Sequence, residues 1–156
     1  MGWVRVEARK RVTTVPPIGH PLVASFDHRV ELLGYDLEET SLKPGDTLHL
    51  TLYWRALAEM DKSYTVFTHL LDSDSQIRGQ KDSIPGKGTL PTTSWVAGEI
   101  ITDRYEIAVH ADAPPGRYIL AIGFYDAGTG QRLPVVNQQG QRVDDRVLLP
   151  TEITLE

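Results

Sequence analysis

The stretch SLKPGDTLHLTLYWRA, residues 41–56, decides the fold class of this chain. A turn signal, Pro44-Gly45-Asp46, precedes a run in which apolar and polar side chains alternate. Because successive side chains of a β-strand point to opposite faces of a sheet, this period of two predicts a half-buried strand. The inward set is Leu48, Leu50, Leu52 and Trp54, and the outward set is His49, Thr51, Tyr53 and Arg55. The outward set is either the solvated face of a sheet or a surface that binds a ligand.

Strand signals recur along the rest of the chain and are separated by turn residues. We expect about eight strands, at 27–37, 46–56, 63–72, 76–82, 99–110, 117–126, 131–136 and 146–155. No apolar pattern with helical spacing lasts about three turns, so no long helix is expected. The strand spacing and the short links predict an all-β fold, an antiparallel β-sandwich of the immunoglobulin or fibronectin type. The strand at 117–126 is the most hydrophobic and is expected at a central position.

Two local features carry separate expectations. Gly34 interrupts the first strand and is expected to mark a bulge. In the strand at 63–72, the buried face stays open, because Val66 and Leu70 compete with Phe67 and Leu71 on the opposite face.

The chain has 156 residues, which suits one domain with terminal segments. Pro16, Pro17 and Pro21 oppose a regular ladder near the start, and this favours a linker there. We divide the chain into a leader and linker at 1–22, a sandwich domain at 23–154 and a cloning remnant at 155–156, with Met1-Gly2 as its counterpart at the start. If these ends are additions, the natural protein is longer.

Composition excludes several kinds of site. Cysteine is absent, which removes disulfides, thiolate metal sites and cysteine nucleophiles. No apolar run approaches the roughly 18 residues of a membrane-spanning helix, so this domain is not expected to span a membrane. The net charge is −5, although residues 1–11 carry an excess of basic side chains. The acidic body argues against nucleic acid as a partner, and the basic start is expected to be solvated.

Trp95 is one candidate binding residue. It lies in a long loop, 83–98, that is rich in Gly, Pro and Thr, and loops of this length are often functional. An indole offers a flat apolar face and one N–H donor, which suits the C–H face of a sugar ring. The alternative is that Trp95 folds back and caps one end of the sandwich.

The outward side chains of 46–56 form a second candidate surface that could hold an oligosaccharide. If the strand at 63–72 pairs beside it, Phe67, Thr65 or His69 joins the same face. The alternative is ordinary cross-strand packing, in which Arg55 lies over Tyr53 or pairs with a carboxylate. The candidate ligand-binding residues are therefore Trp95, Tyr53, Arg55, His49 and His69.

Catalytic and metal-binding motifs are missing. The histidines form no H-x-H or H-E-x-x-H pair, and no G-x-S-x-G is present. Asp72–Ser75 lacks the pattern of a calcium loop, so a tight turn is expected there. PGKGT, residues 85–89, lacks the spacing of a phosphate loop. Glu99, Asp103 and Glu106 follow one expected strand with no sign of a cleft. We therefore expect no catalytic residue, no metal and no cofactor.

The segments PGDTLHLTLYWRA, YTVFTHLLD, SWVAGEIITDRYEI and APPGRYILAIGFYD resemble the extracytoplasmic β-sandwich domain at the end of some large bacterial membrane glycosyltransferases. These are proteins of the family-39 type, similar to dolichyl-phosphate-mannose–protein mannosyltransferases, and the resemblance covers residues 26–136. It implies a non-catalytic appendage outside the membrane, attached to a membrane-spanning remainder that performs the transfer chemistry. It assigns no functional residue here. The segment 12–22 would then be the tether, with the basic run beside lipid headgroups.

We therefore expect a non-catalytic, monomeric accessory domain that binds or positions glycan. The alternative is a purely structural domain that braces the parent protein through a sheet edge or the Tyr53 face. A hydrolase is a third and less favoured class, because the motifs for it are absent.

Overall fold

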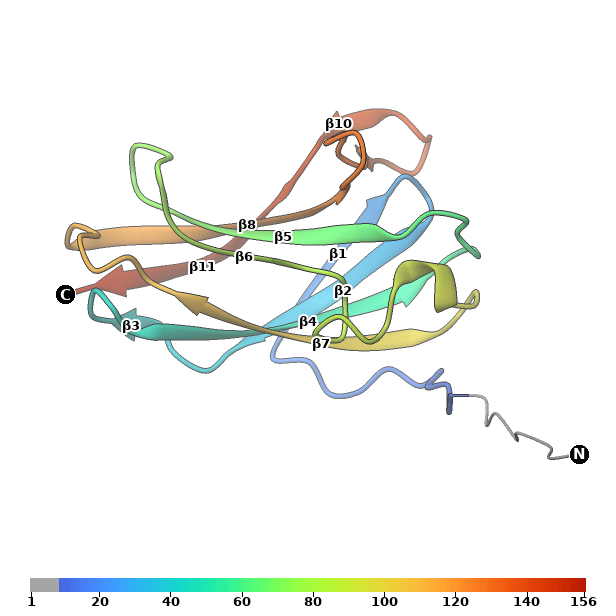
Figure 1. The fold of residues 1–156 in the computed structure, drawn as a ribbon, viewed down its shortest axis with the longest axis horizontal. Helices are drawn as coiled ribbons and strands as arrows, with labels where there is room; N and C mark the ends of the chain where they lie inside the picture. Colours follow the sequence, from blue (N-terminus) through green and yellow to red (C-terminus); the bar gives the residue numbers. More distant parts are fainter. Residues whose placement is uncertain (1–8) are drawn as a thin grey trace, which may run out of the picture.

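The computed structural model describes residues 9–156, which form two β-sheets packed face to face (Figure 1). Residues 1–8, which contain the Met1-Gly2 pair, lie outside the described residues. Sheet A contains β1 (His20–Phe26), β2 (Val30–Leu37), β4 (Thr47–Ala56), β7 (Ile100–Ala108), β9 (Val135–Val136) and β10 (Arg142–Asp144). Sheet B contains β3 (Ser41–Leu42), β5 (Tyr64–Leu71), β6 (Ile77–Ser83), β8 (Gly116–Asp126) and β11 (Val147–Leu155). The expected all-β sandwich is confirmed.

The strand order is β10-β9-β1-β2-β4-β7 in sheet A and β3-β11-β8-β5-β6 in sheet B. The short β3 pairs with β11 in parallel, and the other pairs are antiparallel. Compared with the expected strands, β1, β3 and β10 are additional. β8 lies between β11 and β5, so its expected central position is confirmed. One turn of 3-10 helix, η1 (Thr92–Ser94), lies in the long loop between β6 and β7.

β4 follows the alternation that its sequence predicts. Leu48, Leu50, Leu52 and Trp54 are buried between the sheets. The Trp54 ring packs against Phe124 of β8, with centroids 4.6 Å apart, and thereby ties the two sheets together. In β5 the core face is the one that carries Val66 and Leu70, which settles the open choice for that strand.

β1 begins at His20, so Pro21 lies inside a strand where no regular ladder was expected. The strand accommodates Pro21 because its pairing with β2 shifts register between Pro21 and Ala24. Gly34 stands opposite Pro21, and a β-carbon there would lie 2.5 Å from the carbonyl oxygen of His20. Register also shifts beside Gly34 between β2 and β4, which confirms the expected bulge.

The segment before β1 packs on the outer side of sheet A, where Figure 1 shows it passing below the sheet. Ile18 contacts Leu33, Tyr53 and Ile100, and the Ile100 amide donates to the carbonyl oxygen of Val12 at 2.7 Å. The part of the chain expected to be a linker is therefore layered onto the domain.

The other end of the chain is also part of the fold. Leu155 is the last residue of β11, is 2% exposed and pairs with Leu42 and Gly116. The described sandwich thus extends beyond the expected range of 23–154 at both ends.

The expected tight turn at Asp72–Ser75 is confirmed. The Asp72 carboxylate accepts the backbone amides of Asp74 and Gln76 at 2.9 Å each, and it pairs with Arg78 at 2.9 Å. The hydrogen bond from Gln76, followed by the one from Arg78, lowers the pKa of Asp72. No helix among residues 9–156 has the length and apolar character needed to cross a membrane.

Candidate functional site

The predicted binding residues do not form one surface. β4 pairs with β2 and β7 in sheet A, whereas β5 pairs with β6 and β8 in sheet B. His49, Tyr53 and Arg55 therefore face outward from sheet A. His69 faces outward from sheet B beside Phe67, with ring centroids 4.9 Å apart. The expectation that β5 extends the β4 surface is wrong, because the chain crosses between the sheets after β4.

Tyr53 is covered rather than presented to solvent. Its side chain is 8% exposed, Ile18 packs against it, and its hydroxyl donates to Asp36 at 2.5 Å. Burial, together with the hydrogen bond to Asp36, raises the pKa of Tyr53 to about 12. The ring offers no open face on which a sugar could stack.

Arg55 and His49 are paired with neighbouring carboxylates. Arg55 donates to Glu31 across the β2–β4 pair at 3.1 Å. His49 Nδ1 lies 2.6 Å from the carboxylate of Glu39, and this hydrogen bond raises the pKa of His49. Ordinary cross-strand pairing describes Arg55, whereas His49 pairs with the connection between β2 and β3. Glu38, Glu39 and His49 bring their ligand atoms within 4.8 Å of one another, so this partly exposed group could hold a divalent cation.

Trp95 belongs to the core. It is 1% exposed, and its Nε1–H donates to the carbonyl oxygen of Leu90 at 3.0 Å. Thr92 fixes the same loop, because its hydroxyl accepts the amide of Tyr64 and donates to the carbonyl oxygen of Lys62. The capping alternative describes Trp95, whose faces are covered by protein.

In the described part of the basic start, Arg9 and Arg11 pack against the domain. Glu99 is 1% exposed and pairs with Arg9, and with Arg11 at 2.7 Å. The two guanidinium groups also donate to the carbonyl oxygen of Ser94 at 2.8 and 2.7 Å. A solvated start is therefore wrong for Arg9 and Arg11, since a buried carboxylate such as Glu99 needs charged partners.

Asp103 points between the sheets and holds the β6–β7 loop. Its carboxylate accepts hydrogen bonds from Trp54 Nε1 at 3.1 Å, the Tyr105 hydroxyl at 2.6 Å and the Gly86 amide at 2.8 Å. Burial raises the pKa of Asp103 in spite of these donors. Burial, helped by the Asp103 charge, also raises the pKa of Tyr105, which keeps the phenol protonated as a donor. Asp103 thus links the loop to the core, while Glu106 on the same strand is exposed.

A shallow hollow on the outer face of sheet B contains residues that the sequence analysis did not propose for binding, apart from Phe67 and His69. Its volume is about 240 Å³. It is lined by Phe67, His69, Asp82, Tyr125, Gly130 and Arg132. We call it the sheet B hollow. Figure 1 shows the β5–β6 turn and the β10–β11 region rising on this side of the sheet.

Strand register brings these residues together. Phe67 stands opposite Asp82 on β6 and Gly123 on β8. A β-carbon at Gly123 would lie 2.5 Å from Phe67 Cζ, so the absence of a side chain there makes room for the ring. The Arg132 guanidinium carbon lies 4.3 Å from the centre of the Phe67 ring. Phe67 is therefore the 2% exposed floor of the sheet B hollow.

The walls of the sheet B hollow carry hydrogen-bonding groups. The Tyr125 hydroxyl donates to Asp82 at 2.7 Å, and this hydrogen bond raises the pKa of Tyr125. Burial lowers the pKa of His69, so at pH 7 its imidazole is neutral and offers one donor and one acceptor. Arg132 supplies donors from the opposite side, with Asp145 at 3.4 Å. This set can bind a ligand that combines an apolar face with hydroxyl groups.

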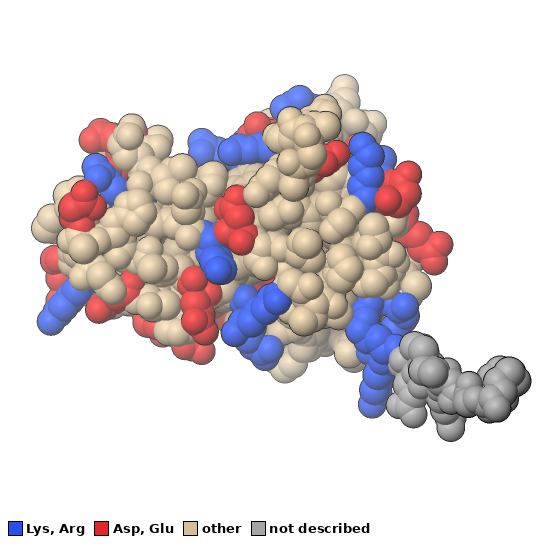
Figure 2. Space-filling model, viewed as in Figure 1, with Lys and Arg blue, Asp and Glu red and all other residues tan. Residues whose placement is uncertain are grey.

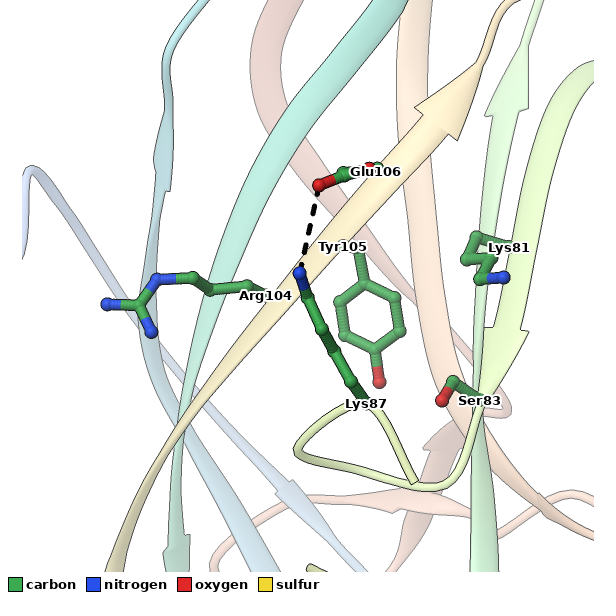
Figure 3. Close-up of a pocket in the computed structure, with 6 residues that line it drawn as sticks. All are labelled: Lys81, Ser83, Lys87, Arg104, Tyr105 and Glu106. Atoms are coloured by element: carbon green, nitrogen blue, oxygen red, sulfur yellow. Dashed lines mark ion pairs between the residues drawn. The ribbon is translucent and has the colours of Figure 1, made fainter. Parts of the chain in front are cut away.

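A second hollow, about 270 Å³ in volume, opens where β6 and β7 meet at the edges of the two sheets (Figure 3). It is lined by Lys81, Ser83, Lys87, Arg104, Tyr105 and Glu106. We call it the mouth hollow. In Figure 3 the Tyr105 ring turns toward β6, whereas Arg104 extends to the other side of β7.

Comparison with family models and with curated proteins gives no match. Among solved structures, the C-terminal domain of Wzt is similar, with a TM-score of 0.52 and 10% identity over 90% of this chain and 82% of that domain. A Niemann-Pick type C2 protein from Japanese carpenter ant has a TM-score of 0.45 and 9% identity over 92% of this chain and 100% of that one. A CARDB domain from Pyrococcus furiosus, in complex with di-metal ions, has a TM-score of 0.44 and 7% identity over 82% of this chain and 94% of that one. At these identities the similarity to Wzt concerns the β-sandwich fold, and the family-39 resemblance stays a prediction.

Proposed function

We propose that this chain is a non-catalytic accessory domain that binds glycan in the sheet B hollow. The observation that carries the proposal is the convergence of aromatic and hydrogen-bonding side chains at one place on that face. Sugar rings present C–H faces that pack on aromatic side chains, and hydroxyl groups that pair with carboxylate, imidazole and guanidinium groups. The sheet B hollow supplies these hydrogen-bonding groups and the half-buried ring of Tyr125, whereas Phe67 beneath is covered.

The proposal keeps the expected class of function and changes the site. Of the predicted residues, His69 remains, while Tyr53 and Trp95 are covered and Arg55 and His49 are paired on the opposite sheet. The family-39 resemblance supports placing the domain on the extracytoplasmic face of a bacterial membrane, as an appendage of a membrane protein. That placement and the lack of catalysis are parts of the proposal.

The test is a titration of the ¹⁵N-labelled protein with a panel of bacterial oligosaccharides, followed by amide NMR shifts. We expect saturable shifts at Tyr125, Gly130 and His69. Two matched pairs of variants locate the site: His69→Ala with His49→Ala, and Arg132→Gln with Arg55→Gln. The His69 and Arg132 variants should each weaken binding about tenfold, equivalent to about 1.4 kcal/mol. Their partners on sheet A should bind like the parent.

Two outcomes would count against the proposal in different ways. If the His49 and Arg55 variants lose binding and the other pair does not, the glycan site is the outer face of sheet A. If no oligosaccharide shifts any amide, glycan binding is refuted, and the bracing role becomes the better account of the domain.

A further inference from the structure

We infer that the mouth hollow binds an oxyanion, and that the glycan held by this domain is an acidic one that carries carboxylate or phosphate groups. The inference rests on the proposed function and deepens it. Its evidence is separate, because none of the residues that line the mouth hollow lines the sheet B hollow.

Charge is the first reason. Lys81, Lys87 and Arg104 line the mouth hollow together with one acidic residue, Glu106, although the whole chain has a net charge of −5. Within residues 9–156, neither Lys81 nor Arg104 has a carboxylate at salt-bridge distance. Figure 2 shows Lys and Arg side chains near the middle of the face in view, with Asp and Glu side chains beside them. The mouth hollow therefore holds an excess of positive charge in an acidic protein.

The backbone that carries Lys87 is the second reason. Gly86, Lys87 and Gly88 have φ angles of +69°, +56° and +87°, so Lys87 is a side-chain-bearing residue inside a left-handed run. Such a conformation is costly without glycine and often marks a functional position. The hydrogen bond from the Gly86 amide to Asp103 holds this run against the core. As a result the Lys87 side chain lies at the rim of the mouth hollow, with Nζ 3.7 Å from Glu106 (Figure 3).

A neighbouring hollow extends the basic surface. It has a volume of about 320 Å³ and shares Lys87 and Arg104 with the mouth hollow, while Thr89 and Thr102 add hydroxyl groups. Lys87 thus stands between two hollows, and a chain of sugar units could occupy both. Lysine and arginine donors with neighbouring hydroxyls suit carboxylate and phosphate oxygens.

The position of β6 connects the mouth hollow to the sheet B hollow. β6 is the edge strand of sheet B, and its side chains alternate between the two sides of the sheet. Asp82 lines the sheet B hollow, while Lys81 and Ser83 line the mouth hollow. A glycan that crosses this edge would meet one acidic and one basic side chain, Asp82 and Arg132, on one side and a mainly cationic set on the other.

The test compares a uronic-acid oligosaccharide with its carboxyl-reduced, neutral counterpart by calorimetry and NMR. We expect the acidic ligand to bind more tightly and to lose affinity as salt is added. The double variant Lys81→Gln/Lys87→Gln should weaken the acidic ligand at least about threefold and leave the neutral one unchanged. Lys43→Gln, which removes one exposed charge in the β3–β4 connection, is the control and should change neither.

The outcomes separate this inference from the proposed function. Equal binding of both ligands, with no effect of the double variant, would overturn the inference and leave glycan binding intact. If neither oligosaccharide binds, the proposed function fails, and inorganic phosphate then tests the mouth hollow alone. Saturable shifts of Lys87 and Gly88 that the double variant abolishes would support an oxyanion site, and a flat phosphate titration would refute it.

Discussion

Replacing Asp103 tests whether a buried carboxylate organises both the core and the β6–β7 loop. In the fold, Asp103 is 0% exposed and accepts hydrogen bonds from Trp54, Tyr105 and the Gly86 amide. Asp103→Ala would leave these three donors without their acceptor. Each unpaired buried donor costs about 1–3 kcal/mol, although removal of a buried charge offsets part of the loss. We therefore expect Asp103→Ala to lower the unfolding free energy by about 3–5 kcal/mol.

The assay is equilibrium urea unfolding followed by tryptophan fluorescence, since Trp54 contacts the replaced group. Glu106→Ala on the same strand is the control; its side chain is exposed, so its effect should stay within about 0.5 kcal/mol. Asp103→Asn keeps one acceptor oxygen but turns an amide NH₂ toward the donors. Its loss of unfolding free energy should therefore fall between those of Asp103→Ala and Glu106→Ala. A loss below about 1 kcal/mol for Asp103→Ala would refute the reasoning, because three orphaned donors cannot cost so little.

The pH dependence gives a second test of the same group. Burial raises the Asp103 pKa in the folded protein above the unfolded value of about 3.9. As pH rises from below that value, the unfolded chain loses its proton first, so the carboxyl destabilises the fold increasingly up to the folded-state pKa, and the penalty is constant above it. The stability of the parent relative to Asp103→Asn should therefore fall as pH rises through this window. A difference that grows with pH would show that the hydrogen bonds outweigh burial.

Four further changes follow from particular contacts. Gly116 opens β8 with φ +143°, so Gly116→Val should lower the unfolding free energy by about 1–3 kcal/mol, and an unchanged melting temperature would contradict the turn assignment. Ser25 Oγ is buried without a partner among residues 9–156, so Ser25→Ala should leave stability equal or raise it by about 1 kcal/mol in urea unfolding. The hydrogen bond to Glu39 raises the His49 pKa, so this pair stabilises the fold below about pH 6.5, and the stabilisation is lost as pH rises through the folded-state pKa of His49. Glu39→Gln should return the His49 pKa, followed by NMR, toward its ordinary value. Lys87→Gly should be about 0.5–1 kcal/mol more stable than Lys87→Gln, because glycine tolerates a φ of +56°; a less stable glycine variant would contradict strain at this residue.

Sequence patterns over a few residues predicted those strands and turns whose conformation depends on neighbouring residues alone. The alternation in β4 and the turn at Asp72–Ser75 needed no distant information, since side-chain period and turn chemistry act over a few residues. β1 was missed because three prolines precede or enter it, and a register shift at Pro21 absorbs the last of them. β3 and β10 are two and three residues long, so they exist only through pairing with β11 and β9.

The candidate site depended on non-local information. The outward direction of Tyr53 followed from alternation, whereas the buried face of the His69 strand was left open. Which strands lie side by side did not follow either, and the crossing from sheet A to sheet B separates the two residues. Trp95 is buried because its loop folds back onto the core, which composition alone cannot show. Asp82 and Tyr125 meet across two strand pairings, at a sequence separation of 43 residues. A firm choice of Val66 and Leu70 as the core face would have pointed to the His69 side as the surface to examine.

The β6–β7 loop connects the buried Asp103 carboxylate to the mouth hollow. This connection explains why a hydrogen-bond acceptor occupies position 103. An apolar residue there would avoid the desolvation of a buried charge, and such replacements are often neutral or stabilising when no partner is left behind. Here the Gly86 amide would be left behind, and Gly86 begins the left-handed run that carries Lys87. The acceptor at position 103 therefore holds Lys87 beside the mouth hollow. If so, Asp103→Asn should retain more oxyanion binding than Asp103→Ala, even at temperatures where both variants are fully folded. Equal binding by the two folded variants would show that Asp103 serves the core alone.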